Sequence, residues 1–233
     1  MDERYLEKRR RVEELFTKRR PLQAPPDVSI SPGGRYRLEV SSYGDDPKHW
    51  ACTRGIVTRL SDGKVLGDIK RNYSHFWHCW VEHPNGKEYL LCGEDYQGYS
   101  LLNLTDEAYH VYFPEEGYKG AGFCWVRVYP SPDQLMLAVD GCYWACPYDL
   151  VFYDFRTPDK LPYRELGRVE DQSECEGWLG NETFALKRGF DTRASDGKRF
   201  EELTDAEQDE LLGNPRLRGY ETERAGITRP SVA

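Results

Sequence analysis

The chain has 233 residues, of which 39% are hydrophobic, 31% are charged and 13% are aromatic, and its formal net charge at pH 7 is −8. This acidic balance argues against wholesale nucleic-acid binding, and the length suffices for one all-β domain with a substantial core. The N-terminus is charged throughout, and no apolar run approaches the roughly 20 residues that span a bilayer. We therefore expect a soluble, cytoplasmic protein without membrane contact, whose seven cysteines stay reduced.

Residues 2 to about 19 have helical composition without a helix breaker. Three- and four-residue spacing places four apolar side chains on one face: Tyr5, Val12, Leu15 and Phe16. Two interpretations remain open for this basic segment. It is either an amphipathic helix packed on its own acidic body, or a docking helix for a partner or nucleic acid. Prolines end the helix, so residues 1–26 form a helix with a proline-rich connector.

Short apolar runs bounded by turn signals predict a β-repeat domain over residues 27–203. In chain order, we expect strands at 35–40, 56–60, 64–69, 73–81, 87–92, 99–104, 109–113, 125–129, 135–139, 150–155, 163–166 and 183–187. A capping box, Thr204-Asp205-Ala206-Glu207, predicts a second helix that ends at Gly213. The rest of the segment 204–233 is polar, and we expect it to be an irregular tail.

The turns repeat along the chain. Pro32, Pro84 and Pro132 recur about every 50 residues, as in blade architectures, and the turn near Gly180 continues the series. These turns, and a Ser-Asp-Gly-Lys motif at residues 61–64 that recurs near the C-terminus, resemble those of WD40-like and TolB-like β-propellers. The resemblance implies an all-β, propeller-like array of about four blades, with one helix at each end. An open, sandwich-like arrangement with edges covered in a homodimer is the alternative.

Long loops occupy the same place in each repeat, so in a blade array they emerge on one face. The expected ligand-binding residues on this acidic and aromatic face are Tyr43, Asp46, His49, Trp50, Glu94, Asp95, Tyr96, Tyr99, Asp140, Tyr143, Trp144 and Tyr148. Aromatic faces attract cations by about 0.5–2 kcal/mol each, and flat rings provide contact area at low entropic cost. The face thus suits a cationic or polyhydroxyl ligand or a basic peptide. In the other interpretation these loops pack on one another and the acids cap turns.

Our leading hypothesis is a non-catalytic binding or scaffold protein with a protein or peptide partner and no cofactor. We expect nucleic acid to bind, if at all, only to the basic N-terminal helix. The alternative is a hydrolase or metal-dependent enzyme in which Glu94, Asp95 and Asp140 form an acid/base set. We expect no metal site, because Cys142 and Cys146 lack the usual spacing of a zinc-binding cysteine pair. No phosphate-cradling glycine-rich loop and no Gly-x-Ser-x-Gly elbow is present.

Overall fold

The computed structural model describes residues 3–44, 50–144 and 147–232, and these are mostly antiparallel β-strands. The first sheet contains β1 (Asp27–Ile30), β2 (Tyr36–Tyr43), β3 (Cys52–Arg59) and β4 (Val65–Arg71). The second contains β5 (Cys79–Glu82), β6 (Glu88–Cys92), β7 (Tyr99–Asn103) and β8 (Ala108–Tyr112). The third contains β9 (Cys124–Pro130), β10 (Met136–Cys142), β11 (Tyr148–Asp154), β12 (Glu165–Trp178), β13 (Thr183–Arg193) and β14 (Arg218–Thr228).

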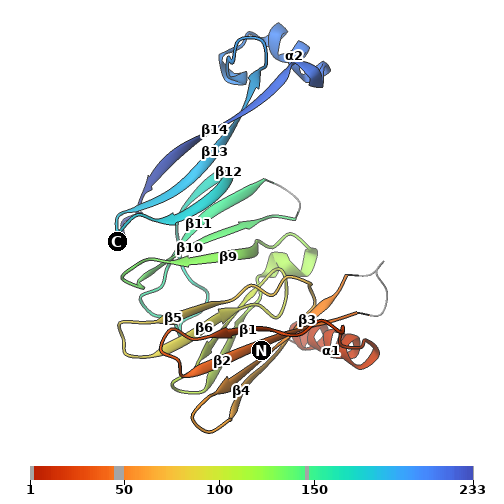
Figure 1. Ribbon diagram of the computed structural model, residues 1–233, viewed down its shortest axis with the longest axis vertical. Helices are drawn as coiled ribbons and strands as arrows, with labels where there is room; N and C mark the ends of the chain where they lie inside the picture. The colour runs from red at the N-terminus through yellow and green to blue at the C-terminus, as the bar shows by residue number, and fades with distance from the viewer. Residues whose placement is uncertain (1–2, 45–49, 145–146, 233) are drawn as a thin grey trace.

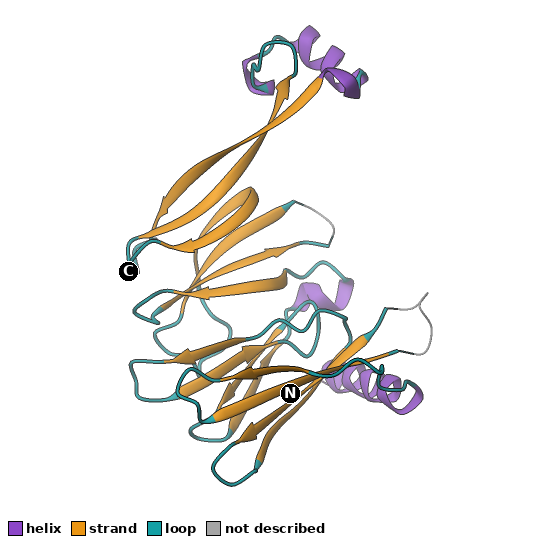
Figure 2. Ribbon diagram, viewed as in Figure 1, coloured by secondary structure: helices purple, strands orange, loops and turns teal. Residues whose placement is uncertain are grey.

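Helices lie at the two ends of the chain. The α-helices are α1 (Glu3–Lys18) and α2 (Asp205–Gly213), and the 3₁₀ helices are η1 (Glu115–Lys119), η2 (Phe200–Glu202) and η3 (Pro215–Leu217). Figure 1 shows the three sheets one above another, with α1 beside the first sheet. Strands β13 and β14 form an arm that carries α2 at its far end (Figures 1 and 2). In the described chain, no helix has both the length and the apolar character needed to cross a bilayer.

The predicted turn is present in all three sheets. In each sheet it connects the first strand to the second. Gly34, Gly86 and Gln134 all have left-handed backbones, with φ of 68°, 83° and 59°. Each donates its N–H to the carbonyl three residues earlier, at 2.8 Å, 3.0 Å and 2.8 Å respectively. Glycine adopts this conformation without cost, whereas Gln134 is a less common occupant of it. The periodic turn motif therefore encodes the start of each sheet.

Two apolar layers hold the sheets together, and the second sheet contributes to both. Between the first and second sheets lie Tyr36, Leu38, Val57, Ile69, Leu90, Cys92, Leu102 and Leu104. Between the second and third lie Trp77, Val81, Tyr89, Leu91, Tyr99, Leu101, Trp125, Leu137, Val139, Val151, Tyr153, Phe155 and Tyr163. Strands β6 and β7 are buried at every position because both faces of the second sheet are covered.

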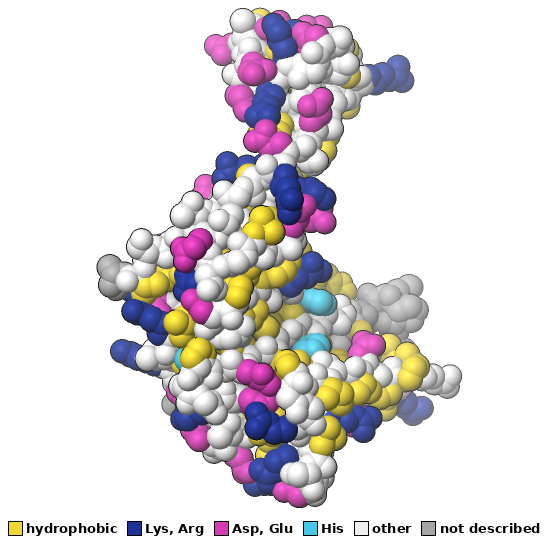
Figure 3. Space-filling view, turned by 60° about the vertical axis from the view of Figure 1, so that its left-hand side comes forward, with side chains coloured by type: hydrophobic (Ala, Val, Ile, Leu, Met, Phe, Trp, Pro, Cys, Tyr) yellow, Lys and Arg dark blue, Asp and Glu magenta, His cyan; other side chains and the backbone are white. Residues whose placement is uncertain are grey.

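The two ends of the stack are finished differently. Alternation places ion pairs on the outer face of the first sheet, including Arg54–Asp68 at 2.7 Å. A polar outer face is how terminal repeats stay soluble. The third sheet instead curls over, so that the Tyr129 ring of β9 lies 5.4 Å from the Phe184 ring of β13. Figure 3 shows charges of both signs interspersed over the visible face.

Several expectations are confirmed and three are corrected. Both helices lie where they were expected. The fourth repeat forms no separate sheet among the described residues, because β13 pairs with β12 of the third. The supposedly irregular tail contains β14, which pairs with β13 along its whole length. The aromatic run expected at 73–81 becomes a strand only at Cys79.

Candidate functional site

Three equivalent connectors meet at one end of the stack. They follow the second strand of each sheet, and their described residues are 44 and 50–51 in the first, 93–98 in the second, and 143–144 and 147 in the third. The indole of Trp50, from the first, stacks on the indole of Trp144, from the third, with 5.6 Å between ring centroids. Tyr96, from the second, lies 5.4 Å from Trp144. One side chain from each connector thus contributes to a single group of aromatic rings.

These rings line a cavity of about 250 Å³. We use the name aromatic cage for its six tryptophan and tyrosine side chains: Trp50, Tyr73, Tyr96, Trp125, Trp144 and Tyr148. Trp50, Trp144 and Tyr148 are 57%, 50% and 40% exposed, which is unusual for large rings that also contact other rings. Trp144 has a left-handed backbone with φ of 45°, a conformation that costs free energy in a bulky residue. The cage therefore presents open ring surface at some cost to the fold.

A buried cation forms part of the cavity wall. Arg71 is 2% exposed, and its guanidinium donates hydrogen bonds at 2.8 Å to the carbonyl oxygens of His75 and Gly93. Burial lowers the pKa of Arg71 to about 10, so the group remains protonated at neutral pH. Within the described residues, the wall contains no Asp or Glu. The lining itself thus carries one positive charge, on which the Asp95 carboxylate acts from outside the wall.

Two of the carboxylates expected on this face, Glu94 and Asp95, hold α1 instead. The Tyr5 hydroxyl donates to Glu94 over 2.5 Å, and the Lys8 ammonium pairs with Asp95 at 3.1 Å. Arg9 donates to the backbone carbonyls of Lys70 and Glu94. Tyr5 and Val12, from the apolar face, are buried. The basic helix is therefore packed on its own acidic body.

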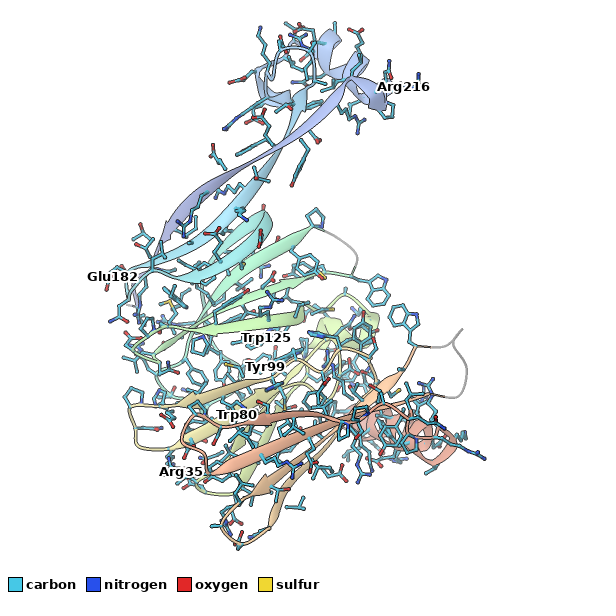
Figure 4. The ribbon with its side chains drawn as sticks, in the orientation of Figure 1. Arg35, Trp80, Tyr99, Trp125, Glu182 and Arg216 are labelled. Carbon is cyan, nitrogen blue, oxygen red and sulfur yellow. The ribbon has the colours of Figure 1, made fainter. Side chains whose placement is uncertain are left out.

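Four other expected site residues that the structure describes do not line the cage cavity. Tyr43 packs on Phe16 of α1, and Tyr143 packs on Phe123. Tyr99 stacks in the core, as Figure 4 shows beside Trp125. Asp140 faces Arg127 across β10 and β9. Asp46 and His49 lie outside the described residues.

Sequence reasoning missed seven residues of the cavity wall: Arg71, Tyr73, His75, Cys124, Trp125, Val126 and Cys142. The direction in which each strand runs could have identified these residues. Antiparallel β2 and β4 both run toward the connector end, and β9 starts there. The residues at these strand ends must therefore lie beside the connectors.

A second cavity, of about 450 Å³, adjoins the cage and shares Trp125 with it. Its wall includes Tyr99, Tyr153, Tyr163 and Gln97. Gln97 is 1% exposed, and neither atom of its side-chain amide has a hydrogen-bond partner among the described residues. An unsatisfied buried amide of this kind is uncommon in native proteins.

Possible metal ligands form no cluster in the described ranges. No three His, Cys, Asp or Glu side chains there are grouped closely enough to hold an ion.

No family model matches the chain. One curated protein does: the uncharacterised protein R762 of Acanthamoeba polyphaga mimivirus is 32% identical over 190 residues, which cover 78% of this chain and 73% of the viral protein. Neither comparison indicates WD40-like or TolB-like repeats. The chain belongs to the same family as this viral protein.

Proposed function

We propose that the protein is a non-catalytic binding protein whose aromatic cage receives one ring of a polyhydroxyl ligand, that is, a sugar ring of a glycan. The observation that carries this proposal is the convergence of half-exposed Trp50 and Trp144, from different sheets, on one small cavity. Cavities that enclose drug-sized ligands usually measure about 300–1,000 Å³. A space of about 250 Å³ instead fits one ring of a longer molecule.

Charge decides between the two ligand classes that aromatic rings favour. A cation gains from ring faces, but the buried guanidinium of Arg71 opposes it and no described carboxylate in the wall compensates. A neutral sugar places its C–H groups on the rings without that repulsion. Its hydroxyls also accept and donate hydrogen bonds, which suits the Tyr73, Tyr96 and Tyr148 hydroxyls around the cavity.

The same proposal includes an architecture. We interpret the three stacked sheets as blades of an open, propeller-like array, because each begins with the same turn and an antiparallel meander. Equivalent connectors then fall on one face, where loops on a rigid scaffold commonly bind ligands. The hydrolase alternative gains no support, since Glu94 and Asp95 hold α1.

Titration of defined neutral oligosaccharides, followed by tryptophan fluorescence and calorimetry, tests the proposal. Trp144→Ala and Trp50→Ala should each lower the affinity at least about tenfold, which equals about 1.4 kcal/mol. Tyr220→Ala is the matched control, because this ring is 63% exposed but lies on the distal arm. Tighter binding of tetramethylammonium than of any sugar, or full binding by both tryptophan variants, would refute the proposal.

A further inference from the structure

Two cysteines face each other at the edge of the cage. Cys124 is the first residue of β9 and Cys142 is the last residue of β10, and they are direct partners in the antiparallel register. Each is 8% exposed, and both line the cage cavity. No disulfide joins any cysteines within the described chain.

The geometry suits a disulfide. Directly opposed residues of antiparallel strands have Cα atoms about 4.5 or 5.5 Å apart and side chains on the same face. A disulfide requires about 4.4–6.8 Å. Next to Cys142, the strands approach so closely that a Cβ at Gly141 would lie 2.3 Å from the Cys124 carbonyl oxygen. Both thiols lie at strand ends, where small adjustments disturb few ladder hydrogen bonds.

The Cys124 thiol is also linked to the cage backbone. Its Sγ donates a weak hydrogen bond to the Gly122 carbonyl oxygen at 3.6 Å, and the nearby backbone N–H of Trp144 lowers the pKa of the thiol. Cys142 precedes Trp144 by only two residues. A covalent bond between the two sulfurs would thus remove the thiol proton that Cys124 donates to Gly122 and constrain the segment that positions the Trp144 ring.

We propose that Cys124 and Cys142 form an oxidative modification site that closes to a disulfide in the presence of a peroxide and loosens the Trp144 side of the cage. The effect on binding depends on the function proposed above, whereas disulfide formation does not.

The chemistry balances with hydrogen peroxide as the oxidant. The Cys124 thiolate attacks one peroxide oxygen, breaks the O–O bond and yields a sulfenic acid and hydroxide. The Cys142 thiol then attacks that sulfur, forms the S–S bond and releases water. Both sulfurs are oxidised, the two peroxide oxygens are reduced, and the hydroxide takes the remaining proton to give a second water.

Burial should make the reaction slow at neutral pH. It raises the pKa of Cys124 to about 11, although the nearby backbone N–H of Trp144 opposes that increase. The attacking thiolate is therefore scarce at pH 7, and we expect the rate to rise about tenfold per pH unit below that pKa. Such a site would respond to strong or sustained oxidant.

The test uses the full-length native protein, treated with hydrogen peroxide at pH 9 and digested under non-reducing conditions. The expected result is a peptide pair linked through Cys124 and Cys142, a mass loss of about 2 Da and quenching of tryptophan fluorescence, all reversed by dithiothreitol. A link between Cys142 and Cys146, or sulfinic acids without any link, would overturn the proposal.

Variants separate the thiol chemistry from the cage function. Cys142→Ala should abolish the link, whereas Cys92→Ala, at a buried position in another core layer, should leave it unchanged. Oxidised wild-type protein should bind an oligosaccharide at least fivefold more weakly than reduced protein. An unchanged affinity would show that the disulfide does not affect ligand binding by the cage. If no sugar binds either form, the proposed function fails, and the mapped link together with the fluorescence change still decides the cysteine chemistry.

Discussion

Two buried amides, Gln97 and Asn103, differ in how the fold satisfies them. The Asn103 side chain donates to Asp106 and Asp159 and accepts from the Asp106 backbone N–H, whereas the Gln97 amide has no partner among the described residues. Leaving a buried polar group unsatisfied costs roughly 1–3 kcal/mol. The wall of the second cavity thus contains a side chain that weakens the fold.

Gln97→Met should therefore raise the free energy of unfolding by about 1 kcal/mol, because methionine fills similar space without an amide to desolvate. Asn103→Leu, the matched control, should lower it by about 2 kcal/mol, since it breaks three hydrogen bonds of a buried side chain. Urea denaturation measures both. Destabilisation by Gln97→Met would mean that the amide is satisfied after all, for example by a bound water.

At the scale of elements, α1 is held to the body by one apolar stripe and a set of hydrogen bonds. Val12 is 3% exposed, whereas Leu6, at the margin of the stripe, is 42% exposed. Val12→Ala should cost roughly 1–2 kcal/mol and increase proteolysis near the N-terminus, because the buried methyl groups leave a gap. Leu6→Ala should change the stability by less than about 0.5 kcal/mol. Equal effects of the two variants would contradict the packing described for α1.

The capping box of α2 makes a prediction about pH. The Glu207 carboxylate accepts a hydrogen bond from the backbone N–H of Thr204, and this bond, followed by that from Arg193, lowers the Glu207 pKa to about 2. A carboxyl with a lowered pKa stabilises the fold above its unfolded pKa near 4.5, and the contribution is lost as the pH falls toward 2.

The amide proton of Thr204 reports this carboxylate directly. In an NMR titration its chemical shift should change with a midpoint near 2, and Glu207→Gln should abolish the transition. A midpoint near 4.5 would show that the capping box does not form in solution.

Elements with apolar alternation or capping signals could be predicted from the sequence, whereas β14, which lacks them, could not. Leu90 and Leu101 lie in runs that identify β6 and β7, and Thr204 marks the start of α2. Strand β14 has the sequence RGYETERAGIT, whose side chains are mostly exposed. Its stability comes from pairing with β13, which is a long-range property that local composition does not record.

At the scale of the whole molecule, the repeated turn was enough to predict that successive sheets stack and that their connectors share one end. The composition of the site was harder to predict. Glu94 and Asp95 lie in the expected connector, but α1, about 90 residues earlier in the chain, takes both carboxylates. Tyr43 and Tyr143 lie in the other two connectors, yet neighbouring rings remove them from the cage. The sequence repeat therefore predicts where the connectors lie. It does not predict where their side chains point, because that depends on contacts between segments distant in the sequence.

The distal arm offers a final test of this organisation. Its tip, residues 194–217, is enclosed by β13 and β14, which pair up to Arg193 and Arg218. The ion pair between Arg193 and Glu207, at 2.7 Å, and the bonds from Arg218 to the carbonyls of Leu211 and Leu212 join the tip to the arm alone. Replacing residues 194–217 by Asn-Gly should therefore leave an ordinary hairpin, since that pair favours the tight turn that antiparallel strands need.

We expect the shortened protein to unfold in one transition, with a free energy of unfolding within about 1 kcal/mol of the parent, because neither interlayer core contains a residue of the tip. Its tryptophan fluorescence should be unchanged, since the cage indoles Trp50 and Trp144 contact each other and no residue of the tip lines the cage cavity. Circular dichroism and urea denaturation measure these properties. A large loss of stability would show that the tip supports the stacked sheets through contacts beyond the arm. The arm and its tip would then contribute to the stability of the stacked sheets, and packing between the sheets alone would not explain the stability of the protein.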